Sequence, residues 1–274
     1  MAHLKKHRGW EIPGRYVTPE HVCCNRRQFI QALGLTGLTL VGLTGFMPIK
    51  TPGPKSPQPT PTVPTRATPV PLNPEFAAST LEHEITPEDT ATTFNNFYEF
   101  SLTKDRVWQL VDRFETRPWE VEVTGLVRKA KIFDIDELIR IMPLEERVYR
   151  FRCVETWAMI VPWTGFPLKA LIDLVEPEPA ARYMRMVTFF RPEQAKGQED
   201  SSWPWPYVEG LTMEEATNEL TLLATGMYGQ ELPKQNGAPV RLGVPWKYGY
   251  KSIKSIVSIE FPATQPAIFW NTVA

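Results

Sequence analysis

Cys153 is the residue of this sequence best suited to chemistry, because it is the only cysteine after position 24. A single thiol cannot form a disulfide within its own domain. Three roles are open: a small core residue, a reactive thiol, or a ligand for a soft metal. Arg150 and Arg152 precede it and Glu155 follows, and cationic neighbours favour the metal-binding thiolate. The alternative is that both arginines face solvent on the opposite side of a strand.

Three further segments carry polar groups that suit a ligand. Residues 95–100 (NNFYEF) combine amide, phenol and carboxyl groups in a short span. Residues 235–241 (QNGAPVR) place an Asn-Gly turn beside an arginine, which suits an anion. Residues 245–254 (PWKYGYKSIK) interleave lysines with aromatic residues, which suits a phosphate. The alternatives are ordinary turns for the first two segments and single-stranded nucleic acid for the third.

Other kinds of active site lack the residues they need. The only histidines are His3, His7, His21 and His83, so a histidine-based zinc site or a Ser-His-Asp triad is disfavoured. No Cys-x-x-Cys, P-loop or GxGxxG is present. What remains is one thiolate together with segments suited to a phosphate-bearing organic cofactor.

The elements that must position these groups have mixed periodicity, which predicts the α+β class. Residues 119–125 and 149–153 alternate as half-buried strands, and residues 253–261 predict a late strand. Short helices are expected over 135–141, 168–175 and 212–216, and the last has a capping box formed by Thr212 and Glu215.

The N-terminal part has the features of an export signal. Residues 1–30 carry a net charge of +4, and Arg26 and Arg27 stand just before an uncharged stretch. We therefore expect residues 1–47 to be a twin-arginine signal, or a membrane anchor if it is not cleaved. The twin-arginine route carries folded proteins, which is indirect evidence for a cofactor inserted before export. The rest of the chain carries about −5, which argues against a nucleic-acid partner.

A proline-rich linker separates this signal from one domain. Residues 48–74 contain ten prolines and predict an extended spacer. Residues 75–274 remain, about 200 residues, which is enough for one well-packed domain.

Six strings in this domain together resemble the sulfite-oxidase family of molybdopterin enzymes, and most closely its periplasmic protein-methionine-sulfoxide reductase catalytic subunits. The strings are residues 95–100 (NNFYEF), 152–155 (RCVE), 161–167 (VPWTGFP), 207–211 (YVEGL), 235–241 (QNGAPVR) and 244–259. The resemblance implies a sulfite-oxidase-type fold of short strands and helices that binds molybdenum-molybdopterin. The chain ends at Ala274, where close relatives usually continue for several dozen residues.

The resemblance also implies roles for particular residues. Cys153 is expected to be the thiolate ligand of molybdenum, and Glu155 and Asn96 to lie close to the metal as catalytic candidates. The remaining cofactor contacts implied are Asn95, Tyr98, Glu99, Thr188, Asn236, Arg241, Ser252, Ile253 and Lys254.

The activity implied is the reduction of methionine sulfoxide in exported proteins by oxygen-atom transfer. No haem or nicotinamide motif is present, so electrons are expected from a haem-containing membrane subunit, and the location is periplasmic or otherwise outside the cytoplasm. One alternative is the same cofactor acting on sulfite or on small S- and N-oxides. Another is a membrane-anchored binding domain without enzymatic activity, in which Cys153 is structural.

Overall fold

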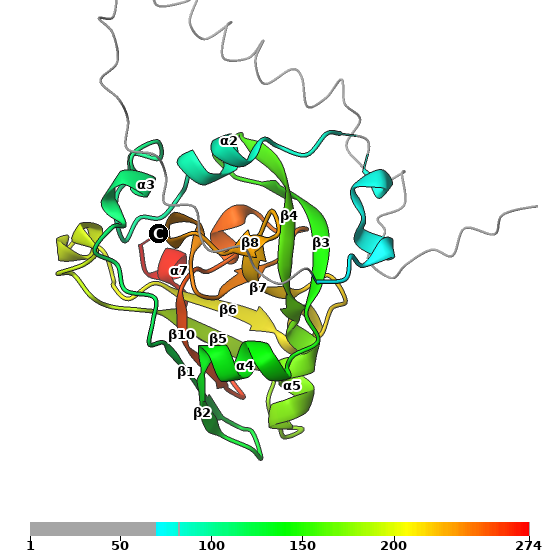
Figure 1. The fold of residues 1–274 in the computed structure, drawn as a ribbon. Helices are drawn as coiled ribbons and strands as arrows, with labels where there is room; N and C mark the ends of the chain where they lie inside the picture. Colours follow the sequence, from blue (N-terminus) through cyan, green and yellow to red (C-terminus); the bar gives the residue numbers. More distant parts are fainter. Residues whose placement is uncertain (1–69, 82, 274) are drawn as a thin grey trace, which may run out of the picture. The chain divides into compact units, whose positions relative to one another are not determined.

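Two five-stranded β-sheets organise the part of the chain described by the computed structural model, residues 70–81 and 83–273 (Figure 1). The first sheet has the order β2-β1-β10-β5-β6, and the second has β3-β4-β7-β8 with β9 also paired to β7. The strands are β1 (Glu120–Gly125), β2 (Lys131–Asp134), β3 (Glu145–Arg152), β4 (Ala158–Pro167), β5 (Tyr183–Thr188), β6 (Val208–Thr212), β7 (Leu222–Met227), β8 (Gln230–Glu231), β9 (Arg241–Gly243) and β10 (Ile256–Phe261).

Short helices connect the strands, so the fold is of the predicted mixed type. The α-helices are α2 (Glu88–Thr93), α3 (Val107–Leu110), α4 (Ile135–Ile141), α5 (Leu168–Val175), α6 (Met213–Ala216) and α7 (Phe269–Val273). The 3₁₀ turns are η2 (Pro74–Phe76), η3 (Ala78–Thr80), η4 (Lys196–Glu199), η5 (Lys234–Asn236) and η6 (Gly249–Lys251).

The first sheet joins the early and late parts of the domain, because β1 pairs in parallel with β10. Val121 and Val123 are buried, as their alternation with glutamates predicts. β1 ends at Gly125 with φ 86°, where a Cβ would stand 2.6 Å from the backbone nitrogen of Phe261. Only glycine accommodates both that conformation and that contact.

The second sheet positions Cys153 at the end of its first strand. β3 and β4 form an antiparallel hairpin that ends with Arg152 opposite Ala158. Tyr149 and Phe151 are buried on β3, whereas Arg150 and Arg152 are exposed. The expected face pattern is thus confirmed, but the strand stops one residue before Cys153.

The predicted helices over 135–141 and 168–175 are confirmed as α4 and α5, with the same first and last residues. In α4 the Asp134 side chain accepts hydrogen bonds from the first-turn amides. The third helix begins at Met213 because Thr212 is its N-cap, and the capping box with Glu215 is present. The late strand, expected over 253–261, starts three residues later than predicted. It begins at Ile256, since Ser255 has φ 49° and the pairing with β5 shifts register after Ile256.

The last residues of the predicted linker lie along β3. Asn73 N donates to Glu146 O at 2.9 Å, and Glu146 N donates to Pro71 O at 2.9 Å. The signal over 1–47 and the linker up to residue 69 lie outside the described residues. Between 70 and 273, apart from residue 82, no helix has the length and apolar character needed to cross a membrane.

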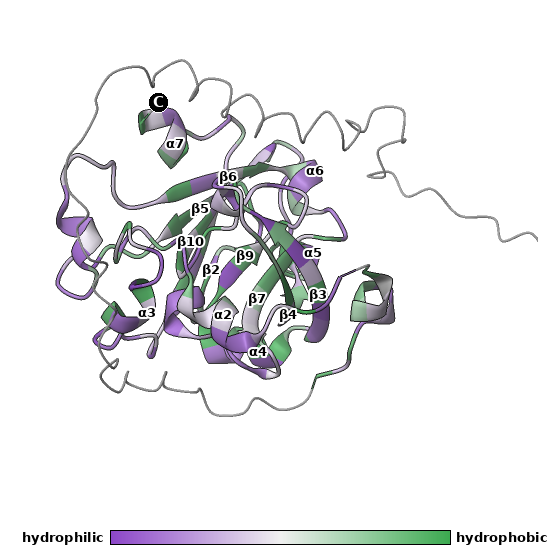
Figure 2. Cartoon of the chain, turned by 90° about the horizontal axis from the view of Figure 1, so that it is seen from above, coloured by the Kyte–Doolittle hydropathy of each residue, from purple (hydrophilic) through white to green (hydrophobic). Residues whose placement is uncertain are grey.

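Two apolar clusters form the core. The larger includes strands β1, β5 and β10, and the smaller includes Phe151 and Trp163 of the second sheet. In Figure 2 green, hydrophobic stretches lie on β5 and β10, while purple stretches are common in the surrounding loops and helices. Members of both clusters line one cavity, so the junction of the clusters forms the site described next.

A candidate cofactor cavity around Cys153

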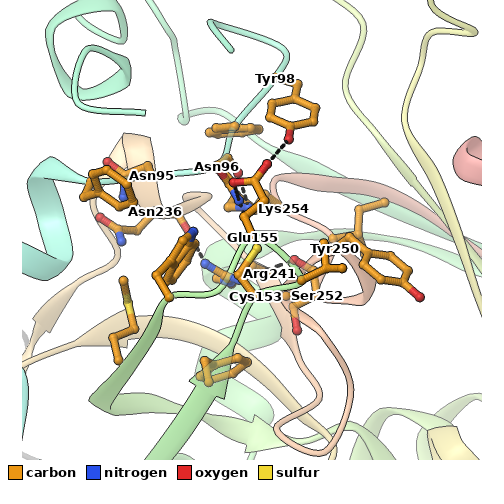
Figure 3. Close-up of a pocket in the computed structure, with 18 of the residues that line it drawn as sticks. Asn95, Asn96, Tyr98, Cys153, Glu155, Asn236, Arg241, Tyr250, Ser252 and Lys254 are labelled. Carbon is orange, nitrogen blue, oxygen red and sulfur yellow. Dashed lines mark hydrogen bonds between the residues drawn. The ribbon is translucent and has the colours of Figure 1, made fainter. Parts of the chain in front are cut away.

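A cavity of about 440 Å³ opens beside Cys153 (Figure 3). Its walls come from segments far apart in the sequence: the stretch after α2, the turn between β3 and β4, and the loop from η6 to β10. Asn236, Arg241, Tyr207 and Trp270 are also part of the lining. A cavity of this size is within the range of small-molecule and cofactor sites.

The turn from 153 to 157 holds the thiol in place. Cys153 N donates to Trp157 O at 2.9 Å, and Thr156 N donates to Cys153 O at 3.1 Å, with Thr156 at φ 75°. Cys153 is 6% exposed, and Asn96 Nδ2 donates to its sulfur at 3.2 Å. A left-handed non-glycine residue marks a turn that its surroundings hold in one conformation.

Glu155 is the acceptor at the centre of a polar cluster beside the thiol. Tyr98 Oη donates to its Oε1 at 2.7 Å, Asn96 Nδ2 donates to its Oε2 at 3.2 Å, and Lys104 Nζ pairs with Oε2 at 2.8 Å. Desolvation opposes ionisation, but the contacts with Lys104, Tyr98 and Asn96 prevail and lower the pKa of Glu155. Burial raises the pKa of Tyr98, so its hydroxyl stays protonated.

Two cations, the buried Arg241 and the half-buried Lys254, also line the cavity. Arg241 donates to Asn236 O at 2.9 Å and Ser252 O at 3.3 Å, and its guanidinium lies over the Trp163 ring. Lys254 Nζ donates to Asn96 O at 2.7 Å. Desolvation lowers the pKa of Arg241 to about 10 and that of Lys254 to about 7. Within the described residues neither forms an ion pair with a carboxylate, although the charge of Glu99 favours protonated Lys254.

Polar atoms near these cations lack partners. The side-chain nitrogens of Asn95 and Asn236 both donate to Ala91 O, which leaves their Oδ1 atoms unpaired. Asn96 Oδ1 and the indole nitrogens of Trp157 and Trp163 are also buried without a partner. Such atoms are destabilising unless a bound group satisfies them.

This set of residues fits molybdenum-molybdopterin. Unpaired cations suit its phosphate, unpaired amide oxygens suit the N–H groups of its pterin, and the Cys153 thiolate suits a soft metal. Throughout 70–81 and 83–273 no cluster of three or more His, Cys, Asp or Glu residues is placed to hold a metal ion.

The structure brings most of the sequence-predicted residues to this cavity. The lining includes Asn95, Asn96, Tyr98, Glu99, Cys153, Glu155, Asn236, Arg241, Ser252, Ile253 and Lys254. Thr188 is the exception, because its hydroxyl donates to Lys254 O at 2.8 Å and supports the backbone behind the wall. Arg150 is exposed, so its charge acts through solvent, and the cation of the cavity that interacts with the thiol is the half-buried Lys254.

Several lining residues were not predicted as site residues: Trp157, Met159, Trp163, Tyr207, Tyr250 and Trp270. Lys104, the partner of Glu155, was also missed. Trp163, Tyr207 and Tyr250 belong to the strings that carry the resemblance, which was the available signal. Trp270 comes from the C-terminal helix, and nothing in its local sequence connects it with Cys153.

Comparison with known proteins agrees with this geometry. A family model described as "Oxidoreductase molybdopterin binding domain" matches residues 108–270. A relative from Burkholderia mallei named "Protein-methionine-sulfoxide reductase catalytic subunit MsrP" is 46% identical over 97% of this chain and 78% of its own. A protein of the same name from Ralstonia nicotianae is 43% identical over 97% of this chain and 77% of its own.

The fold also has a counterpart among solved structures. The sulfane dehydrogenase SoxCD of Paracoccus pantotrophus matches with a TM-score of 0.51 at 17% identity, over 68% of this chain and 45% of that chain. At this level of identity the match concerns the fold alone.

Proposed function

The chain belongs to the protein-methionine-sulfoxide reductase catalytic subunits among the oxidoreductases that bind molybdopterin, and from this premise we propose that it reduces methionine sulfoxide in proteins to methionine at the Cys153 cavity. The observation that carries this proposal is that one fixed thiol, two cations without a carboxylate partner and unpaired amide oxygens surround one cavity. It is a site that requires a group with a soft metal, an anion and N–H donors.

Different residues of the chain would bind different parts of molybdenum-molybdopterin. Cys153 Sγ would be the protein ligand of molybdenum, while Arg241, Ser252 and Lys254 would hold the phosphate. The amide oxygens of Asn95 and Asn236 would accept hydrogen bonds from the pterin. Bound molybdenum-molybdopterin supplies two-electron oxygen-atom transfer, the chemistry that turns a sulfoxide into a thioether.

The side chains beside Cys153 control charge and protonation around the reaction. Glu155 remains ionised near neutral pH, and Tyr98 and Asn96 hold its carboxylate in one orientation. Asn96 also fixes the sulfur through its side-chain nitrogen. Each sulfoxide reduced consumes two protons and two electrons, and the removed oxygen leaves as water.

We infer that the electrons come from a haem-containing membrane subunit and that the protein works outside the cytoplasm after twin-arginine export. The name "catalytic subunit" carried by the relatives supports a partner subunit. The twin arginines and the proline-rich stretch of the sequence support export and a spacer.

The proposal is tested with protein purified from a molybdenum-replete host, using reduced viologen as electron donor. We expect close to one molybdenum per chain by mass spectrometry and reduction of sulfoxide in an oxidised protein. Cys153→Ser is expected to abolish activity and the spectroscopic signature of the metal while leaving the circular dichroism unchanged. Cys24→Ser, which removes a thiol from the leader, is the matched control and is expected to retain both.

Two outcomes would refute the proposal. A well-folded wild-type protein without molybdenum would return Cys153 to a structural role. A molybdenum-loaded protein that oxidises sulfite but leaves protein sulfoxides untouched would assign the cofactor to the other substrate class.

A further inference from the structure

The two sides of the cavity differ in chemical character. In Figure 3 Asn95 and Asn236 lie to one side of Cys153, and Tyr98 and Tyr250 lie to the other. The first side carries the unpartnered amide oxygens. Tyr207 and Trp270 also line the cavity, where Trp270 contacts Tyr98 and Tyr207 contacts Tyr250, and we call Tyr98, Tyr207, Tyr250 and Trp270 the aromatic wall.

Three of the four side-chain polar groups of the aromatic wall are already engaged. Tyr98 Oη donates to Glu155 at 2.7 Å. Trp270 Nε1 donates to Tyr207 Oη at 2.9 Å, and Tyr207 Oη donates to Tyr250 O at 2.8 Å. The Tyr250 hydroxyl points away from Cys153 in Figure 3. The wall therefore offers mainly aromatic carbon to the cavity, whereas the amide oxygens suited to a pterin and the cations suited to a phosphate belong to other segments.

The wall is held in place by contacts behind it. Phe269, the neighbour of Trp270 in α7, is 2% exposed. Its ring stacks on Tyr207 at 4.6 Å and on Trp203 at 5.6 Å between centroids. Trp270 meets Tyr98 edge-on at 6.1 Å. Because these contacts involve only residues of the protein, the wall keeps its position whether or not the opposite side is filled.

We propose that the aromatic wall is the subsite for the alkyl groups of the sulfoxide, an inference that rests on the proposed function. A methionine sulfoxide side chain has one strongly polar atom, its oxygen, which must approach the metal beside Cys153. The remainder is a methyl group, two methylenes and a sulfur, which gain from burial against apolar surface and from contact with aromatic rings. Trp270 then selects alkyl sulfoxides over small polar oxyanions such as sulfite.

The test measures how activity depends on the alkyl chain. With a series of methyl alkyl sulfoxides from methyl to butyl and reduced viologen, wild-type kcat/KM should rise about fourfold for each methylene that the wall buries. In Trp270→Ala the rise should fall to about twofold or less, through KM, as buried apolar surface is lost. Trp270→Phe keeps an aromatic ring and should retain the rise. Molybdenum per chain should stay at the wild-type level in both variants.

Trp108→Ala is the matched control, because Trp108 lies in α3 outside the cavity lining, with its indole nitrogen bonded to Asp105 O. It should keep the wild-type dependence. If Trp270→Ala fails to fold, Tyr250→Ala replaces it, since Tyr250 is 40% exposed and its truncation leaves the core intact. Tyr250→Ala should weaken the dependence in the same direction.

Three results would overturn the inference. An unchanged chain-length dependence in the folded variant would show that the wall does not contact the alkyl group. Loss of molybdenum from Trp270→Ala would assign the wall to the cofactor. A molybdenum-loaded wild type that reduces no sulfoxide would remove the proposed function, and this inference with it.

Discussion

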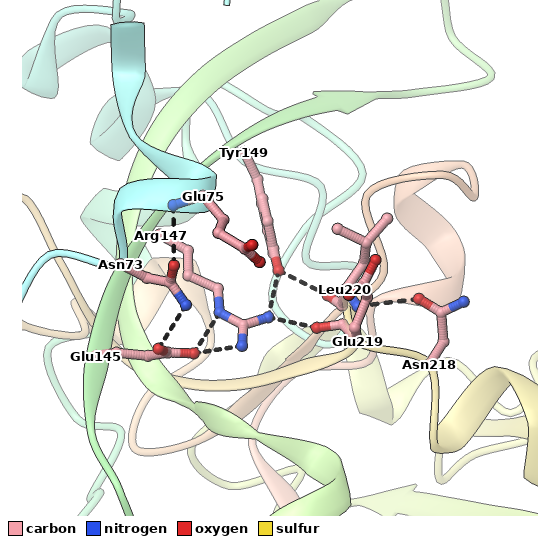
Figure 4. A network of polar contacts seen from close by, with 8 residues as sticks. All are labelled: Asn73, Glu75, Glu145, Arg147, Tyr149, Asn218, Glu219 and Leu220. Carbon is pink, nitrogen blue, oxygen red and sulfur yellow. Dashed lines mark hydrogen bonds and ion pairs between the residues drawn. The ribbon is translucent and has the colours of Figure 1, made fainter. Parts of the chain in front are cut away.

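Arg147 offers a test of the forces that hold β3 in place, away from the cavity. Its side chain is 5% exposed, pairs with Glu145, and donates to Tyr149 Oη at 2.8 Å and Glu219 O at 2.6 Å (Figure 4). Its guanidinium also lies 4.5 Å from the centre of the Phe76 ring. These contacts join the first described residues, β3 and the segment before β7.

Replacing Arg147 with methionine keeps the aliphatic volume but removes the charge and its hydrogen bonds. Removing one partner of a buried ion pair costs about 3–5 kcal/mol. The lower end applies, because the Glu145 side chain is 20% exposed and keeps a hydrogen bond from Asn73 at 2.8 Å. We therefore expect unfolding to become easier by about 3 kcal/mol, and Tm to fall by about 6–12 °C in a domain of roughly 200 residues.

The measurement is thermal and urea unfolding of the purified domain, followed by circular dichroism. Arg150→Met is the control, because Arg150 carries the same charge on the same strand but is exposed. A surface change of this kind is expected to stay within about 0.5 kcal/mol. The reasoning is refuted if Arg147→Met loses no more stability than Arg150→Met.

Two further predictions concern the cavity, the first in the cofactor-free protein and the second in the cofactor-loaded protein. Desolvation raises the pKa of Glu99 from 4.5 to about 7, so its contribution to stability is present below pH 4.5 and is lost as pH rises through 7. The free energy of unfolding of Glu99→Gln, relative to that of the wild type, should therefore rise by up to roughly 3 kcal/mol between pH 5 and pH 8 in urea unfolding. A difference between the two proteins that stays constant with pH would contradict this. Arg241→Gln should release the pterin about tenfold faster or more, since a charge-assisted contact to phosphate is worth about 1.5–3 kcal/mol. This is measured as pterin fluorescence after gel filtration, and wild-type retention would contradict it.

Local patterns in the sequence predicted the frame of the site well. Alternation of Tyr149 and Phe151 with arginines was enough to predict β3 and its buried face, since side-chain direction has period two in a strand. Thr212 and Glu215 predicted the start of α6, because a capping box is a local interaction. The resemblance then indicated residues from four separate segments, which the fold gathers around one cavity.

What the sequence missed depends on contacts between distant segments. The start of β10 is set by the left-handed Ser255 and by pairing with β5, and neither has a local signature. Thr188 lies outside the cavity lining, because its hydroxyl bonds to the backbone of Lys254, 66 residues away. Trp270 reaches the cavity through Tyr207, 63 residues earlier in the chain. Contacts of this kind can be identified only from the three-dimensional arrangement of the strands.

The pairing of β1 with β10 has a consequence for how the protein is made. Trp119 Nε1 donates to Ile256 O across 137 residues, and β10 lies between β1 and β5 in the first sheet. A nascent chain on the ribosome lacks this central strand, together with Arg241, Ser252 and Lys254, until almost all of the described sequence has emerged. Contacts of such long range form late in folding. Cofactor insertion must therefore follow synthesis of β10, and an occupied cavity reports that β10 has joined the first sheet.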